Sequence, residues 1–144
     1  MPSIEIRESD IDTVVALSKE IPELANPHEA EEYRKRLTGV PHLILVAFAE
    51  ESAIGFKVGY EREGYFYSWM GGVLPEFRKL GVAQALADVQ EDWAKKRGYP
   101  TITFKTRNSH KGMLIFALKN GFDIIGLEPK STTPQHRILL RKQL

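Results

Sequence analysis

The chain contains no cysteine among its 144 residues. This absence excludes disulfide bonds, thiolate metal ligands and a cysteine nucleophile. Since a reducing compartment favours such a composition, we expect a cytoplasmic protein. The histidines are scattered without the spacing of a ligand pair, so we predict no metal site. They are His28, His42, His110 and His136.

Long hydrophobic segments and a charge excess of one sign are also missing. No apolar run approaches the ~20 residues of a membrane helix, and the first five residues lack the basic and apolar regions of a signal peptide. The net charge of +1 provides no broad basic surface for nucleic acid. The glycine patterns G-x-G-x-x-G and G-x-x-x-x-G-K-[ST] are absent, which excludes the usual dinucleotide and P-loop sites. We therefore expect neither a nucleic-acid nor a membrane partner.

What remains is the composition of an ordinary globular domain, with 42% hydrophobic and 27% charged residues. No linker, repeat or low-complexity tract divides the chain, so we predict a single domain over residues 1–144. Hydrophobic periodicity and turn residues predict alternating strands and helices. The expected strands are 4–7, 42–49, 53–62, 65–73, 101–106, 122–127 and 137–140, and the expected helices are 9–21, 27–38, 82–97 and 111–120. Asn26 is expected to cap the second helix, and Asn108 with Ser109 the fourth.

The segment from Val73 to Ala83 is the most informative part of the sequence. It joins an aromatic strand to the helix from Val82 through the pattern Arg78-x-x-Gly81-x-Ala83. A helix that begins in such a turn has unpaired backbone N–H groups at the positive end of its dipole, which can bind an anion. Gly81 would admit a phosphate closely and Arg78 would add charge. The alternative is an ordinary strand-to-helix turn, because short glycine motifs recur by chance.

This segment, V-x-P-x-F-R-x-x-G-x-A, resembles the acyl-coenzyme-A signature of the GNAT (general-control-related) N-acetyltransferase family. A second segment, Asn108 followed by Lys119-Asn120-Gly121-Phe122, is similar to a later motif of that family. The order of the expected elements also fits, so the resemblance covers essentially the whole chain. It implies an α/β (α+β) GNAT fold: a mixed, mostly antiparallel sheet of about seven strands, splayed between the fourth and fifth, with four helices.

The resemblance implies acetyl-CoA as co-substrate and no metal. The pantetheine arm would enter the splayed gap like an added strand, and the turn before the third helix would hold the pyrophosphate. The paired glycines Gly71 and Gly72 indicate either a bulge or a close backbone approach, or else a simple bend. The residues expected to bind the cofactor are Gly72, Val73, Leu74, Arg78, Lys79, Leu80, Gly81, Val82, Ala83, Asn108 and Phe116.

The implied reaction is attack of an amine on the thioester of acetyl-CoA, for which orientation and a backbone N–H at the oxyanion supply much of the catalysis. The sequence departs from the family at Ala117, where many members have a tyrosine that protonates the leaving thiolate. A substitute proton donor could be Tyr67, Tyr65 or Ser68 on the central strand, or water.

Candidate bases for the amine are Glu61 and Glu63, which are otherwise solvated carboxylates beside a turn. Asn108 is a further candidate catalytic residue, which is expected to bind pantetheine or position a water molecule, and it can serve as a helix cap as well. The missing tyrosine also leaves open a second function, a non-catalytic acyl-CoA-binding or sensing module. A generic phosphate-binding domain is a third.

The acceptor is expected to contact residues 21–30, the meander strands and the loop 130–135. Several glutamates in the first two helices either favour a cationic acceptor or are ordinary exposed helix residues. They are Glu20, Glu23, Glu29, Glu31 and Glu32. Members of the family often dimerise, which leaves a homodimer open.

Overall fold

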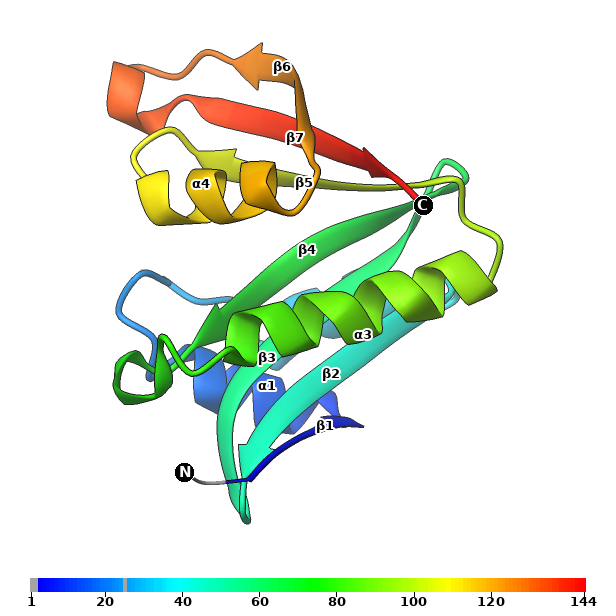
Figure 1. Ribbon diagram of the computed structural model, residues 1–144, viewed down its shortest axis with the longest axis vertical. Helices are drawn as coiled ribbons and strands as arrows, with labels where there is room; N and C mark the ends of the chain where they lie inside the picture. Colours follow the sequence, from blue (N-terminus) through cyan, green and yellow to red (C-terminus); the bar gives the residue numbers. More distant parts are fainter. Residues whose placement is uncertain (1–2, 25) are drawn as a thin grey trace.

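A computed structural model describes residues 3–24 and 26–144, which form one seven-stranded sheet covered by four α-helices (Figure 1). The strands are β1 (Ile4–Glu8), β2 (His42–Ala49), β3 (Ser52–Arg62), β4 (Tyr65–Val73), β5 (Thr101–Arg107), β6 (Asp123–Glu128) and β7 (Arg137–Gln143). The helices are α1 (Ile11–Ser18), α2 (Ala30–Leu37), α3 (Val82–Lys96) and α4 (Lys111–Lys119), with short 3₁₀ turns η1 (Pro75–Phe77) and η2 (Thr133–Gln135).

The strand order is β1-β2-β3-β4-β5-β7-β6, and every neighbouring pair is antiparallel except β4 and β5. The parallel pair is joined through α3, as a parallel connection requires a crossover. This confirms the predicted fold class, a mixed and mostly antiparallel sheet with four helices.

The parallel pair β4–β5 is paired over only a short distance. The ladder has two residue pairs, Phe66↔Ile102 and Tyr67↔Thr103, after which the strands diverge (Figure 1). On its other side β4 pairs with β3 as far as Val73. One edge of β4 is therefore open beyond Tyr67, in the interior of the sheet, and the predicted splay between the fourth and fifth strands is confirmed.

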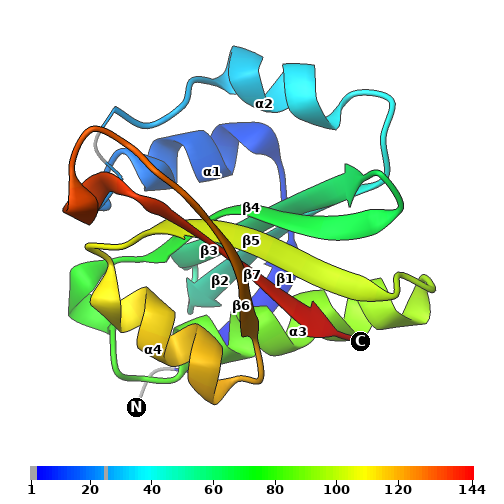
Figure 2. The same ribbon diagram turned by 90° about the horizontal axis from the view of Figure 1, so that it is seen from above.

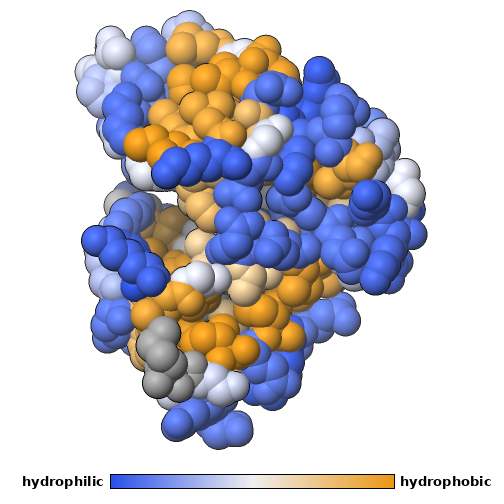
Figure 3. Space-filling model, viewed as in Figure 1, coloured by the Kyte–Doolittle hydropathy of each residue, from blue (hydrophilic) through white to orange (hydrophobic). Residues whose placement is uncertain are grey.

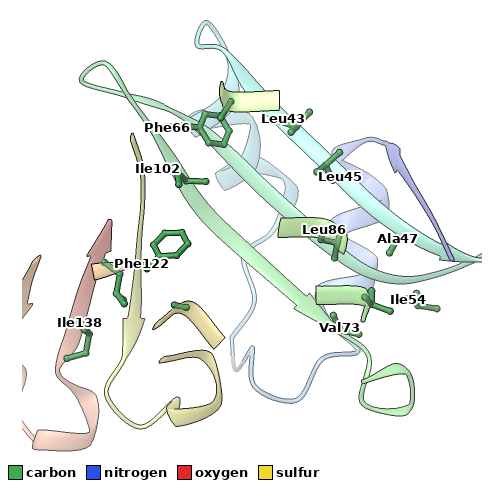
Figure 4. Packing of buried hydrophobic residues seen from close by; sticks show 14 of the residues in the cluster. Leu43, Leu45, Ala47, Ile54, Phe66, Val73, Leu86, Ile102, Phe122 and Ile138 are labelled. Carbon is green, nitrogen blue, oxygen red and sulfur yellow. The ribbon is translucent and has the colours of Figure 1, made fainter. Parts of the chain in front are cut away.

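The two faces of the sheet carry separate hydrophobic clusters. The first packs under α3 and α4 and includes Leu86, Phe122 and Ile138 (Figure 4). The second packs under α1 and α2, which Figure 2 shows on the opposite side of the sheet. Since side chains alternate along a strand, β4 contributes to both: Phe66 to the first and Tyr67 to the second.

One predicted helix start and one predicted helix cap are wrong. Helix α2 begins at Ala30, later than predicted, because Asn26 lies in the left-handed region (φ 54°) and the chain stays irregular up to Glu29. Helix α4 has His110 at its N-cap, and Asn108 does not cap it, because the Asn108 amide is bonded to Thr133 and Lys111.

No helix within the described parts of the chain is long and apolar enough to cross a membrane. The surface over α4 and β6 is unusually apolar, as the orange area in the upper half of Figure 3 shows. Its exposed side chains include Ile115, Leu118, Ile124 and Leu127. The homodimer stays a prediction.

Candidate active site

The turn between β4 and α3 is built on two residues in left-handed conformation. Lys79 has φ 65° and Gly81 has φ 82°, so the chain reverses between η1 and α3 within a few residues. Gly81 is the N-cap of α3 and supplies no side chain to cap it. An added Cβ at Gly81 would meet nothing within 4 Å, so the space beside the helix start is open.

This turn presents a run of unpaired backbone donors. The first helical hydrogen bond of α3 runs from the Ala85 N–H to the Gly81 carbonyl, at 3.0 Å. Within residues 3–24 and 26–144, the N–H groups from Lys79 to Gln84 have no hydrogen-bond acceptor. These six free donors lie at the positive end of a 15-residue helix, where an anion is stabilised. Binding of pyrophosphate at this turn stays a prediction.

Val73 presents its backbone to the open edge of β4. The Leu74 N–H donates to Ile54 of β3 at 2.8 Å, and the Leu74 carbonyl accepts from Phe77. Because successive residues of a strand direct their polar groups to opposite edges, those of Val73 point away from β3, toward β5. Gly72, Val73 and Leu74 were all predicted to bind the cofactor. Val73 has its N–H on the open edge, whereas the backbone groups of Leu74 are already used within the protein.

Gly72 lies under the linker between α1 and α2. A Cβ at this position would approach Ile21 Cδ1 to 2.9 Å. The close approach that the paired glycines predicted is thus confirmed at Gly72. The β-bulge of this strand pair lies earlier, where Ser68 and Met70 pair with consecutive residues of β3.

The Arg78 side chain turns toward the α1–α2 linker. Its Nη1 and Nη2 each donate to a carboxylate oxygen of Glu23 at 2.7 Å, and its Nε donates to the Val73 carbonyl at 3.1 Å. The hydrogen bond from Arg78 holds the pKa of Glu23 below its usual range. The charge predicted for the anion site is therefore neutralised by Glu23 here, and the contact of Arg78 with pyrophosphate stays a prediction.

Tyr67 occupies the point where β4 and β5 separate. Its side chain is buried, packs edge-on against Tyr60 at 5.6 Å and lies under the guanidinium of Arg62. Burial, followed by the neighbouring Tyr60, raises the pKa of Tyr67 above its ordinary value. At neutral pH the phenol is therefore protonated, the form in which it can donate a proton or a hydrogen bond.

Glu61 lies on the other face of the sheet. Its Oε1 accepts a hydrogen bond from the Tyr99 hydroxyl at 2.8 Å, and Tyr99 packs with the α3 cluster. Tyr67 belongs to the α1–α2 cluster. The two predicted catalytic residues are therefore not brought together, because Tyr67 and Glu61 alternate onto opposite faces. Glu63 is exposed in the turn that follows.

Asn108 joins two loops through hydrogen bonds. Its N–H donates to the His136 carbonyl at 2.8 Å, and its Nδ2 to the Thr133 carbonyl at 3.3 Å. Its Oδ1 accepts from Lys111. These bonds bind the end of β5 to the β6–β7 connection, so the side chain predicted for catalysis has a structural task.

At the family's tyrosine position and next to it, neither Ala117 nor Phe116 has a side chain that can donate a proton. Ala117 is 1% exposed and faces the core with Phe122, while Phe116, the preceding residue, is half-buried and outside both core clusters. The end of α4 is joined to the first turn of α3, because Gln84 Nε2 donates to Asn120 Oδ1 at 2.7 Å. No sequence pattern indicated that contact.

A split parallel strand pair beside a helix start rich in free N–H groups defines the class of acyl-coenzyme-A transferases with this fold. The model of the acetyltransferase (GNAT) family matches residues 11–122, and the chain belongs to that family. The comparison with curated proteins found no match.

Solved structures with the same fold cover nearly the whole chain. The ribosomal-protein-S18-alanine N-acetyltransferase of Escherichia coli has a TM-score of 0.83 at 13% identity, covering 98% of this chain and 94% of its own. The PaiA N-acetyltransferase of Thermoplasma acidophilum, in complex with coenzyme A, has a TM-score of 0.76 at 19% sequence identity, and the match covers 99% of both chains. A GNAT family acetyltransferase of Elizabethkingia anophelis with acetyl-CoA bound has a TM-score of 0.78 at 22% identity, and the match covers 98% of both chains.

Proposed function

We propose that this protein transfers an acetyl group from acetyl-CoA to a primary amine of a small molecule or a protein, by direct attack in a ternary complex. The observation that carries the proposal is the run of free N–H groups from Lys79 to Gln84, beside the open edge of β4. Coenzyme A or acetyl-CoA in two structures of the same fold supports this donor. The absence of cysteine keeps the cytoplasm as the expected location.

The residues present fit the donor. The N–H groups from Lys79 to Gln84 would bind the pyrophosphate, and the Val73 N–H would hold the pantetheine arm along β4 as an added strand. When bound, acetyl-CoA supplies an acyl group already activated as a thioester. The protein then has to orient the amine and manage protons.

Tyr67 is the residue we assign to proton donation. It lies where the gap closes, and its raised pKa keeps the phenol protonated at neutral pH. Tyr65 lies two residues earlier on the same face of β4, half-buried and farther from the gap. The pair therefore provides a matched comparison within one strand.

The test follows release of coenzyme A thiol from acetyl-CoA with a panel of primary amines. We expect amine-dependent release, and a kcat lower by about 10²-fold in Tyr67→Phe with an unchanged KM for acetyl-CoA, as for loss of a general acid. Tyr65→Phe should keep the wild-type kcat. Equal losses in the two variants would remove Tyr67 from the proposed role.

The alternative, a non-catalytic acyl-CoA-binding module, is favoured by one observation, the buried Ala117 at the usual tyrosine position. It predicts that acetyl-CoA binds in calorimetry while no amine accelerates thiol release over the rate in water. Binding of coenzyme A no tighter than ADP would instead favour a generic phosphate-binding domain.

A further inference from the structure

A basic pocket of about 430 Å³ lies where β5 ends and β7 begins. Its lining combines cationic side chains with hydroxyl and amide groups and includes no carboxylate. The lining residues are Arg107, Lys130, Ser131, Thr132, Gln135 and Arg137. Its size is that of a site for a small molecule, and its chemistry is that of a site for an oxyanion.

The two arginines of this pocket lie directly opposite one another. Arg107 of β5 pairs with Arg137 of β7 in the antiparallel ladder, an arrangement in which like charges repel. Neither guanidinium has an ion-pair partner in residues 3–24 or 26–144. The nearest acidic position in register with Arg137 is Glu128 of β6, and its carboxylate is bonded by Lys105 at 3.2 Å. An anion between the arginines would relieve the repulsion.

The pocket opens on the side of the sheet opposite to α3 and α4. Ile138, which follows Arg137, packs with Ala117 of α4 in the first cluster, so the Arg137 side chain is directed to the other face. Tyr67 also faces that side. The field of Arg137 reaches the Tyr67 phenol, whose pKa is raised chiefly by burial and lowered slightly by that charge. The pocket and the proposed proton donor therefore share one face of the gap.

The pocket is preformed by its loop contacts. The Asn108 N–H donates to the His136 carbonyl at 2.8 Å, and the Ser109 N–H to the Pro134 carbonyl at 3.0 Å. The Lys130 N–H donates to His136 Nδ1 at 2.9 Å. Such preorganisation lowers the entropy cost of holding a ligand.

Several acidic side chains expected to favour a cationic acceptor are already used. Glu23 is paired with Arg78, Glu29 with Lys19, and Glu32 with Arg36. The pocket itself is lined by no carboxylate and by three cationic side chains, which are Arg107, Lys130 and Arg137.

We propose that this pocket binds a carboxylate or phosphate group of the acceptor, so that the substrate is a small amine that also carries an oxyanion. The part of this proposal that concerns the amine rests on the proposed function. The affinity of the pocket for an anion is independent of it. Arg107 and Arg137 then determine specificity by clamping the oxyanion while the amine extends toward the gap.

The first arm of the test measures anion binding without turnover. Inorganic phosphate and acetate are titrated separately against the full chain and followed by NMR shifts of the Arg107 side chain, because the free N–H groups at the start of α3 can bind an anion as well. We expect saturable binding of at least one anion, lost in Arg137→Gln and kept in Arg141→Gln, which removes the same charge from the same face of β7 outside the pocket. Which anion binds more tightly tells phosphate from carboxylate. Absence of binding, or equal loss in both variants, overturns the proposal.

The second arm compares acceptors in matched pairs: glycine with glycinamide, 4-aminobutyrate with its amide, and phosphoethanolamine with ethanolamine. We expect the anionic member of at least one pair to have a kcat/KM at least about tenfold higher, through KM, as for a charge-assisted hydrogen bond. Arg137→Gln should abolish that preference and leave the affinity for coenzyme A unchanged. A preference for the neutral members, or an equal loss of coenzyme A affinity, overturns the proposal. Anion binding in the first arm with no acetylation of any amine would contradict the proposed function instead.

Discussion

Arg78 and Glu23 are joined by two parallel hydrogen bonds of 2.7 Å, although 55 residues separate them in the sequence. One residue belongs to the turn that begins α3, and the other to the linker between α1 and α2. Both side chains are more than a third exposed, so solvent screening limits the contribution of the pair to stability to about 1 kcal/mol. Its larger effect is on charge, because it cancels the arginine nearest to the free N–H groups.

Replacing Glu23 should therefore strengthen donor binding. In Glu23→Gln the Arg78 guanidinium is no longer neutralised, so we expect several-fold tighter binding of coenzyme A in calorimetry, with a gain that shrinks at high salt. Glu20→Gln, which removes an exposed carboxylate outside this pair, should change little. Weaker binding in Glu23→Gln would mean that Glu23 holds Arg78 in its binding position.

The effect of the left-handed backbone at Gly81 can be tested separately from side-chain clashes. Gly81→Ala meets no neighbouring atom but forces a side chain into φ 82°, which should lower the free energy of unfolding by about 1 kcal/mol. It should also weaken coenzyme A binding by disturbing the helix start. Gly112→Ala, in α4 and equally free of neighbours, should be stabilising by up to about 0.5 kcal/mol and leave binding unchanged. Urea unfolding shows whether each substitution raises or lowers the free energy of unfolding. A decrease in both variants would contradict this explanation.

The contact between Gly72 and Ile21 predicts a coupled pair of substitutions. Gly72→Ala places a methyl group at 2.9 Å from Ile21 Cδ1, which should cost about 1 kcal/mol because the end of the isoleucine can move. Ile21→Val removes that atom, so the double variant should be more stable than the sum of the single effects. Gly71→Ala, whose Cβ would meet the Phe56 carbonyl at 3.2 Å instead, should gain nothing from Ile21→Val. Simple additivity at Gly72 would rule out the contact.

The hydrogen bond from Tyr99 to Glu61 predicts a loss of stability in strongly alkaline solution. Burial, followed by this bond to Glu61, raises the pKa of Tyr99 to about 12 from 10.0. Since the folded-state pKa is the higher one, the stabilising effect is complete below pH 10 and disappears as the pH rises from 10 through 12. Tyr99→Phe should lower stability at pH 7 by about 1 to 1.5 kcal/mol and flatten the loss above pH 10. If the free energy of unfolding of Tyr99→Phe still falls above pH 10 as steeply as that of the wild type, Tyr99 is not the cause of the loss.

Local sequence patterns predicted the elements of this fold well. The continuous apolar run of β2, the aromatic alternation of β4 and the amphipathic stripe of α3 identify their own structures, because burial on one or both faces requires them. The predicted start of α2 was wrong because Asn26 has a left-handed backbone (φ 54°) in place of the extended one that a helix cap needs, and Glu29 takes the N-cap position.

The donor half of the candidate site was also visible in the sequence, since Gly81 and its turn are local features. The charge relationships were not. Glu23 with Arg78, and Arg107 with Arg137, come from segments far apart in the chain, and their contacts depend on sheet register and loop packing. The same holds for Glu61 and Tyr67, whose opposite faces follow from strand alternation around a hairpin.

The short ladder between β4 and β5 has a mechanical consequence. The two strands are paired only at Phe66 and Tyr67 of β4. Beyond these residues no backbone ladder fixes the angle between the strands. The hydrogen bond between Gln84 and Asn120 joins α3, which follows β4, to the end of α4, which follows β5. In the proposed reaction, smaller side chains along this gap are therefore expected to admit a longer acyl group with no change in topology.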